Sequence, residues 1–78
     1  MLNIYGSPLS SPTNKVRYVA NFLGLNTEFH PVNLGAGEQR SPEYLKINPL
    51  AKVPAIEDEG FTLAESNAII RYMANKCN

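Results

Sequence analysis

The sequence predicts an α/β domain with a four-stranded mixed sheet flanked by three helices. Short apolar runs bounded by glycine and proline predict strands, and longer segments with apolar residues at helical spacing predict helices. They alternate as strand, helix, strand, helix, strand, strand, helix. The first strand-helix-strand unit should cross over right-handed with parallel strands, and the later hairpin should be antiparallel. The 78 residues suffice for a single domain, covering residues 1–78.

The first half of the chain predicts two strands with a helix between them. An apolar run at residues 2–5, broken by Gly6, is expected to form the first strand. From Pro12 the apolar period becomes helical and Gly24 ends it, which predicts a helix over residues 12–23. Residues 27–34 predict the second strand, and Pro31 marks it as an edge strand because proline cannot donate a ladder hydrogen bond.

The second half predicts a short helix, a hairpin and a closing helix. Residues 39–47 could form about two helical turns, with Ser41 as the cap and Pro42 at the first helical position. Residues 53–57 and 61–63 form the expected hairpin. Residues 65–77 predict the last helix, and its apolar face is expected to include Met73 and Cys77.

Composition favours a local binding site over long-range charge attraction. Seven Lys and Arg residues balance seven Asp and Glu residues, so no strong field would gather nucleic acid or an anionic membrane. The single cysteine cannot form an internal disulfide, which favours a reducing compartment. No signal peptide or run of membrane-spanning length is recognisable. We therefore expect a soluble, cytoplasmic protein without nucleic-acid, membrane or metal partners.

The most informative local feature is Pro54, which follows Val53 inside a strand pattern. If Val53 and Pro54 enter an edge strand, the N–H and C=O of Val53 face outward and can pair with an extended, peptide-like ligand. We expect the bond between them to be cis, a form usually retained to fix a loop. An ordinary turn into an edge strand is the alternative.

Two helix starts carry polar side chains that suit either capping or ligand binding. Ser10 and Ser11 precede Pro12; one hydroxyl suffices as a cap, and the second could face an anion at the positive helix end. Glu65 and Ser66 open the last helix, where they could cap it. Alternatively, Glu65 would bind an ammonium group and Ser66 a carboxylate of the same ligand.

Three segments together resemble the N-terminal, thioredoxin-like domain of the glutathione S-transferase family, in its serine-type theta, delta, phi or bacterial classes. They are Ser10 ahead of Pro12, the run Asn48-Pro-Leu-Ala-Lys-Val-Pro-Ala-Ile56, and the run Leu63-Ala-Glu-Ser-Asn-Ala-Ile-Ile70. The resemblance covers essentially the whole chain. It implies glutathione as the cosubstrate, laid as a pseudo-strand against Val53 with its γ-glutamyl end at Glu65 and Ser66.

The resemblance also implies individual roles. Ser10 would hydrogen-bond the glutathione sulfur and stabilise its thiolate for attack on an electrophile, with Ser11 as the fallback because the doublet leaves the register open by one residue. Gln39, Arg40 and Lys52 would hold the glycine carboxylate. For Arg40, a solvated charge at a helix end is the alternative. Serines stand in the place of the Cys-x-x-Cys motif of thioredoxins, so dithiol exchange through these residues is excluded.

Two departures from the family pattern keep a second function open. Asn67 stands where many relatives have arginine, which puts one polar contact in doubt. The family's all-helical C-terminal domain, which supplies the electrophile pocket and much of the dimer interface, is not expected within residues 1–78. Tyr18, Phe22 and Tyr72 are candidates for packing against such a domain or a second copy in a homodimer, or else ordinary core residues. The alternative to a detoxifying transferase is a non-catalytic glutathione-binding or protein-interaction module, or a fragment with little or no transferase activity.

Overall fold

The structure, a computed structural model, describes residues 1–77 and confirms the predicted order of elements. Two single 3₁₀ turns, η1 and η2, precede the short helix α2. The elements are β1 (Leu2–Gly6), α1 (Ser11–Phe22), β2 (Thr27–Pro31), η1 (Leu34–Ala36), η2 (Glu38–Arg40), α2 (Pro42–Leu45), β3 (Ala55–Asp58), β4 (Phe61–Ala64) and α3 (Ser66–Lys76). No helix within residues 1–77 has the length and apolar character needed to cross a bilayer.

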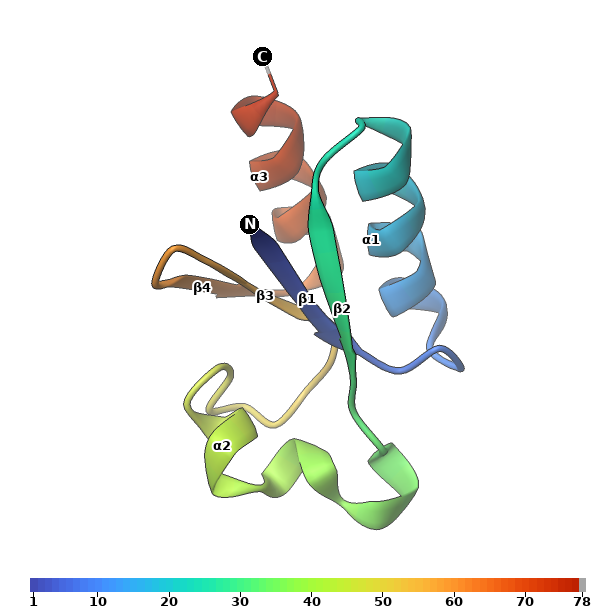
Figure 1. The fold of residues 1–78 in the computed structure, drawn as a ribbon. Coiled ribbons are helices and arrows are strands. Elements are labelled where there is room, and N and C mark those ends of the chain that lie inside the picture. Colours follow the sequence, from blue (N-terminus) through green and yellow to red (C-terminus); the bar gives the residue numbers. More distant parts are fainter. Residues whose placement is uncertain (78) are drawn as a thin grey trace.

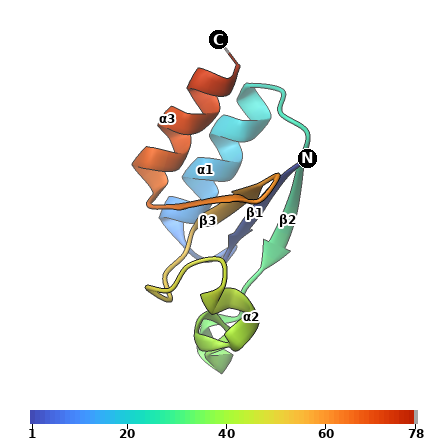
Figure 2. The same cartoon turned by 90° about the vertical axis from the view of Figure 1, so that its left-hand side faces the viewer.

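The four strands form one mixed sheet in the order β2-β1-β3-β4, which confirms the predicted fold class. β1 is parallel to β2 and antiparallel to β3, and β3 is antiparallel to β4. α1 and α3 lie side by side against one face of the sheet (Figures 1 and 2). α2 lies beyond the end of the sheet at which β1 ends (Figure 1).

The main core lies between the sheet and the helices α1 and α3. Leu2 and Ile4 of β1 point into it, because side chains alternate along a strand and these two share a face. Asn3 and Tyr5 belong to the opposite face, which we call the open face. The buried residues of the main core are Leu2, Ile4, Val16, Ala20, Ile56, Ile69 and Met73. A smaller cluster of Val32, Tyr44 and Ala55 packs with Tyr5.

The prediction that Pro54 enters an edge strand is wrong. β3 is an interior strand between β1 and β4. Its pairing ends at Ala55, which lies opposite Tyr5 on one side and Ala64 on the other. Pro54 therefore precedes the ladder and removes no hydrogen bond from it, which is why an interior strand can follow a proline.

Other boundaries differ from the sequence predictions by a few residues. β2 is an edge strand as predicted, but it ends at Pro31. α2 is a single turn, capped by Ser41 as predicted. Gly37 adopts a left-handed conformation with φ of 77°, which separates the two 3₁₀ turns and prevents one continuous helix. Cys77 is exposed rather than on the apolar face, because it lies past the end of α3.

Candidate functional site

The candidate binding residues gather where β1 ends and β3 begins. A cavity of about 260 Å³, which we call the Val53 pocket, lies between the start of α1, the loop before β3 and the start of α3. It brings together two of the three predicted segments, with Pro12 beside them. The lining residues that the site uses are Pro12, Lys52, Val53, Pro54, Glu65 and Ser66.

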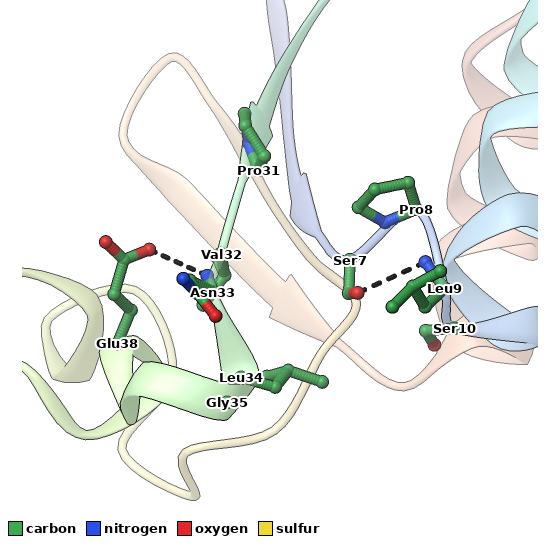
Figure 3. A pocket seen from close by; sticks show the side chains of 10 residues that line it. All are labelled: Ser7, Pro8, Leu9, Ser10, Pro31, Val32, Asn33, Leu34, Gly35 and Glu38. Carbon is green, nitrogen blue, oxygen red and sulfur yellow. Dashed lines mark hydrogen bonds between the residues drawn. The ribbon is translucent and has the colours of Figure 1, made fainter.

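A second hollow also reaches the start of α1. This Ser10 groove, of about 560 Å³, runs between the loop that follows β1 and the segment that follows β2 (Figure 3). Ser7, Pro8, Leu9 and Ser10 form one wall and residues 31–35 with Glu38 form the other. Ser10 thus lines the groove, while Pro12, two residues later, lines the Val53 pocket.

Ser10 is the N-cap of α1. Its backbone is extended, with φ of −94° and ψ of 121°, and its Oγ accepts a hydrogen bond of 3.3 Å from the backbone N–H of Thr13. Because the oxygen acts as an acceptor there, the hydroxyl hydrogen remains available to a ligand. Ser11 is exposed on the first turn and its side chain makes no hydrogen bond within residues 1–77.

The loop that carries Ser10 is held by a close approach between β1 and α1. A Cβ on Gly6 would lie 2.4 Å from Cγ2 of Thr13, so only glycine fits there. Thr13 is fully buried and its Oγ1 accepts a hydrogen bond of 3.4 Å from the N–H of Ser7. Asn14 donates to the Pro8 carbonyl at 2.8 Å. These contacts fix the position of the Ser10 hydroxyl relative to the sheet.

The loop before β3 is fixed through the carbonyl of Lys52. Buried Asn48 donates to this carbonyl at 3.0 Å, and the hydroxyl of Tyr44 donates to it as well. Asn48 also accepts a hydrogen bond of 3.0 Å from the N–H of Leu50. Burial raises the pKa of Tyr44 to about 12, so its phenol remains a donor at neutral pH.

The Val53–Pro54 peptide bond is cis, and Pro54 is buried while Val53 is half-buried. Val53 lies one residue before Pro54 and two before the last paired residue, Ala55. Its N–H and C=O are therefore outside the ladder and take part in no loop hydrogen bond within residues 1–77. The backbone of Val53 is available to a ligand because it lies past the end of the ladder, and not because its strand is at an edge.

Glu65 is the N-cap of α3 and has an unusual backbone conformation. Its φ is 80° and its ψ is 116°, a region that side-chain-bearing residues rarely adopt and that costs about 1–3 kcal/mol. Its Oε1 accepts hydrogen bonds from the N–H of Asn67 at 3.0 Å and of Ala68 at 3.2 Å. Oε2 has no partner within residues 1–77, so the cap leaves one carboxylate oxygen for a ligand.

The structure does not bring every predicted site residue to the pocket. Gln39 and Arg40 lie on η2 and line neither the Val53 pocket nor the Ser10 groove. Oε1 of Gln39 is buried without a hydrogen-bond partner within residues 1–77. Arg40 is exposed. Asn67, at the start of α3, accepts a hydrogen bond of 2.9 Å from Lys15 of α1.

Sequence reasoning assigned no role to three residues that shape the site. Thr13, Tyr44 and Asn48 are buried and bind the loops that carry Ser10 and Val53. Asn48 belongs to the quoted motif and directly precedes a proline. Because Asn-Pro is typical of turns, the sequence indicates a turn at Asn48. The sequence does not indicate that the partner of Asn48 is the carbonyl of Lys52, four residues later. Within residues 1–77 no group of three or more His, Cys, Asp or Glu side chains is arranged to bind a metal.

Comparisons with known proteins agree with this geometry. The family described as "Glutathione S-transferase, N-terminal domain" matches residues 1–75. Glutathione S-transferase 3 of Zea mays is 43% identical over 75 residues, which are 96% of this chain and 34% of that protein. Glutathione S-transferase theta-1 of Rattus norvegicus is 40% identical over 76 residues, 97% of this chain and 32% of that protein. The chain thus spans about a third of the length of these relatives.

Solved structures give the same result. Glutathione transferase F7 from Populus trichocarpa superimposes with a TM-score of 0.92 at 40% identity, over 99% of this chain and 36% of that one. Glutathione transferase E6 from Drosophila melanogaster gives a TM-score of 0.94 at 39% identity, over 97% of this chain and 34% of that one. The chain therefore belongs to the glutathione S-transferase family, as its N-terminal, thioredoxin-like domain.

Proposed function

We propose that the Val53 pocket and the Ser10 groove together bind one glutathione molecule, and that Ser10 stabilises its thiolate for attack on an electrophile. The observation that carries the proposal is the Val53 pocket itself. It combines an unpaired backbone at Val53 with a carboxylate and a helix start at Glu65 and Ser66. A tripeptide with a charged amino end is the ligand that suits these three groups.

The γ-glutamyl end would bind at the start of α3. Its ammonium group would pair with Oε2 of Glu65, the oxygen that the cap leaves unused. Its carboxylate would accept hydrogen bonds from the N–H and hydroxyl of Ser66, at the positive end of an 11-residue helix. Because Glu65 is itself held by two backbone N–H groups, little side-chain freedom is lost on binding.

The middle of the ligand would pair with the backbone of Val53, which places the cysteine thiol toward the start of α1. A thiol has a pKa near 8.5 in water, and a helix N-terminus with a hydroxyl donor lowers it. Ser10 suits this role because its Oγ already accepts from Thr13, so its hydrogen points elsewhere. Ser10 acts as a hydrogen-bond donor and not as a base. Ser11 remains the alternative sulfur partner.

The glycine carboxylate at the other end would bind Lys52, which lines the Val53 pocket. Gln39 and Arg40 are the further candidates for this end, on the neighbouring turn η2. Lys52 has the stronger support because its backbone is fixed by Tyr44 and Asn48. Arg40 lines neither the Val53 pocket nor the Ser10 groove.

A helical domain or a second copy would cover the apolar side of α1 in a longer protein of this family. Tyr18 is 72% exposed and Phe22 is 78% exposed, and they lie one helical turn apart. Tyr72, the third candidate from the sequence, is half-buried and stacks on Phe61 at 5.2 Å. Conjugation to electrophiles, and thus a detoxifying role, depends on that covering partner, since the Ser10 groove is open and Leu9 in it is 94% exposed.

The direct test is calorimetric titration of the chain with glutathione, alongside turnover of an aryl halide. We expect saturable binding. Binding with turnover supports a transferase, binding without turnover supports a glutathione-binding module, and no binding overturns the proposal.

Two variants test the assigned roles. Glu65→Gln keeps an oxygen for the cap but removes the charge, and we expect it to bind glutathione at least about tenfold more weakly. An unchanged dissociation constant would contradict the proposed orientation of the ligand. Ser10→Ala should raise the pKa of the bound thiol by about one to two units with a smaller effect on affinity. Thiolate absorbance of bound glutathione against pH measures this, with Ser11→Ala as the matched control. A shift in Ser11→Ala alone would move the role to Ser11.

A further inference from the structure

A third cavity lies on the open face of the sheet. This Tyr5 pocket, of about 440 Å³, is bounded by the sheet on one side and by the segment from η2 to α2 on the other. Its volume falls within the range of about 300–1,000 Å³ that is usual for small-molecule sites. It shares none of its lining residues with the Val53 pocket, whereas Pro31, Val32 and Glu38 also line the Ser10 groove. The residues that matter here are Tyr5, His30, Glu38, Glu43 and Tyr44.

The walls of the Tyr5 pocket are aromatic. The rings of Tyr5 and His30 stack with centroids 4.7 Å apart and an interplanar angle of 17°. Tyr5 also meets Tyr44 edge to face at 6.2 Å and 66°. Tyr5 thus contacts both other rings, and the faces of aromatic rings attract cations through their quadrupoles.

Hydrogen bonds across three strands fix the tautomer of His30. Glu57 on β3 accepts a hydrogen bond of 2.8 Å from the amide nitrogen of Asn3 on β1, so the amide oxygen of Asn3 must face the other way. That oxygen lies 2.9 Å from Nε2 of His30, which therefore carries the hydrogen. In the neutral ring Nδ1 is then the nitrogen that can accept a hydrogen bond.

The charge around the Tyr5 pocket is negative. Glu38 and Glu43 line it, and no Lys or Arg is among its lining residues. Glu38 uses Oε1 to accept a hydrogen bond of 2.7 Å from the N–H of Asn33, which holds its carboxylate in place (Figure 3). Burial, and then the negative fields of Glu57 and Glu28, raise the pKa of Tyr5. Anionic ligands are therefore disfavoured on this face.

We propose that the Tyr5 pocket binds a small organic ammonium ion, separately from the Val53 pocket. The aromatic rings would contact the cation and its carbon frame, the carboxylates of Glu38 and Glu43 would offset its charge, and Nδ1 of His30 would accept an ammonium hydrogen. This site does not depend on glutathione binding. Its aromatic walls come from the open face and from α2, whereas Ser10, Val53 and Glu65 line the other two cavities.

The test is an NMR titration of the ¹⁵N-labelled chain with phenethylammonium chloride. We expect saturable shifts at the amides around Tyr5, His30 and Tyr44, and little change around Glu65. The neutral analogue 2-phenylethanol and the anion 3-phenylpropionate are the controls. Equal affinity for the neutral analogue, or shifts spread over the whole surface, would overturn the proposal.

Variants that remove one carboxylate charge test the role of charge in binding, and we expect them to keep the fold. Glu43→Gln and Glu38→Gln should each weaken binding by about threefold to fivefold, and the exposed residue Glu59, in the turn between β3 and β4, provides the matched control Glu59→Gln. Glu38→Gln keeps an oxygen for Asn33. If Glu59→Gln weakens binding as much as the pocket variants do, the effect is general electrostatics and the proposed site is wrong.

A third variant tests the role of the imidazole. His30→Phe keeps a ring to stack on Tyr5 but removes the acceptor. It should weaken binding of phenethylammonium and leave binding of the N,N,N-trimethyl analogue nearly unchanged, since that cation has no N–H to donate. Equal losses of affinity for both cations would show that His30 does not accept an ammonium hydrogen. If His30→Phe does not fold, the affinity of Glu43→Gln tests the site instead.

Discussion

Alternating residues of β1 give its two faces different environments. Leu2 and Ile4 face α1 and α3, and both are at most 2% exposed. Asn3 and Tyr5, their neighbours, face the open side, where they bind His30, Glu57 and the aromatic ring of Tyr44. One face is apolar and packed, whereas the other is polar, ring-lined and hollowed by the Tyr5 pocket.

This difference separates stability from recognition within a small domain. Burial of apolar area supplies most of the folding free energy, so the helix-covered face should dominate the response to mutation. The open face contributes hydrogen bonds that exchange with water on unfolding and are each worth about 1 kcal/mol. It can therefore vary its chemistry at little cost to the fold. The predictions below test this separation in order of expected size.

The largest effect is expected on the helix-covered face. Met73 is fully buried, so Met73→Ala should lower the free energy of unfolding by about 2–5 kcal/mol through lost contacts and a cavity. Thr62 is exposed on the open face, and Thr62→Ala should cost less than about 1 kcal/mol. Urea unfolding measures both. Losses of similar size would mean that the two faces do not differ as described.

A second effect is expected where a carboxylate lies at the margin of the main core. Asp58 is 6% exposed; it accepts a hydrogen bond of 2.7 Å from Tyr72 and pairs with Lys76 at 3.1 Å. Asp58→Asn should cost about 2 kcal/mol because a charge-assisted bond is lost. Lys76→Met should cost less than Asp58→Asn, since the Lys76 side chain is 44% exposed and its ion pair is screened by solvent. The reverse ranking in thermal or urea unfolding would contradict this account.

Tyr44, on the open side near the site, should give a smaller effect with a distinctive pH dependence. Tyr44→Phe should cost about 1 kcal/mol, since Asn48 still binds the Lys52 carbonyl. The pKa of Tyr44 is about 12 in the folded chain and 10.0 ordinarily. Its contribution is therefore complete below about pH 10 and lost as the pH rises through about 12. Urea unfolding at pH 9 and 11 should show a weaker decline for Tyr44→Phe; an unchanged decline would show that Tyr44 does not keep its proton.

The smallest effect is expected at Glu57 on the open face. Hydrogen bonds from the backbone of Gly60 and from Asn3 hold the pKa of Glu57 below its ordinary value of 4.5. Its contribution is therefore present above about pH 4.5 and lost as the pH falls through the depressed value. Glu57→Gln should make unfolding less sensitive to acid, and the remaining sensitivity should include Asp58, whose pKa is also lowered. An unchanged acid slope would contradict the assignment.

The elements predicted best from sequence are those with local signals. α1 and α3 have apolar residues at helical spacing and recognisable caps, and the hairpin has its turn at residues 59–60. The interior position of β3 was not predictable in this way. It depends on pairing between Leu2 and Asp58, which are far apart in the chain, and no local pattern encodes that pairing. The same reason explains the incorrect edge-strand prediction for Pro54.

The candidate site was predictable to a similar extent. The caps at Ser10 and Glu65 follow from residue type and position, and the structure brings Val53, Glu65 and Ser66 to one pocket. The hydrogen bonds of Tyr44 and Asn48 to Lys52 depend on the fold of residues 44–52, including the positive φ of 59° at Ala51. Composition does not predict such a conformation at an alanine.

The backbone of Glu65 has a consequence for laboratory evolution. At φ of 80° and ψ of 116° glycine would be less strained than glutamate, whose backbone strain is released on unfolding. Selection for thermostability alone should therefore enrich glycine at this position, since glycine is also tolerated as an N-cap, and selection for ligand binding should retain glutamate. If the two selections favour different residues at position 65, glutamate is retained there for its carboxylate, although its backbone conformation favours glycine.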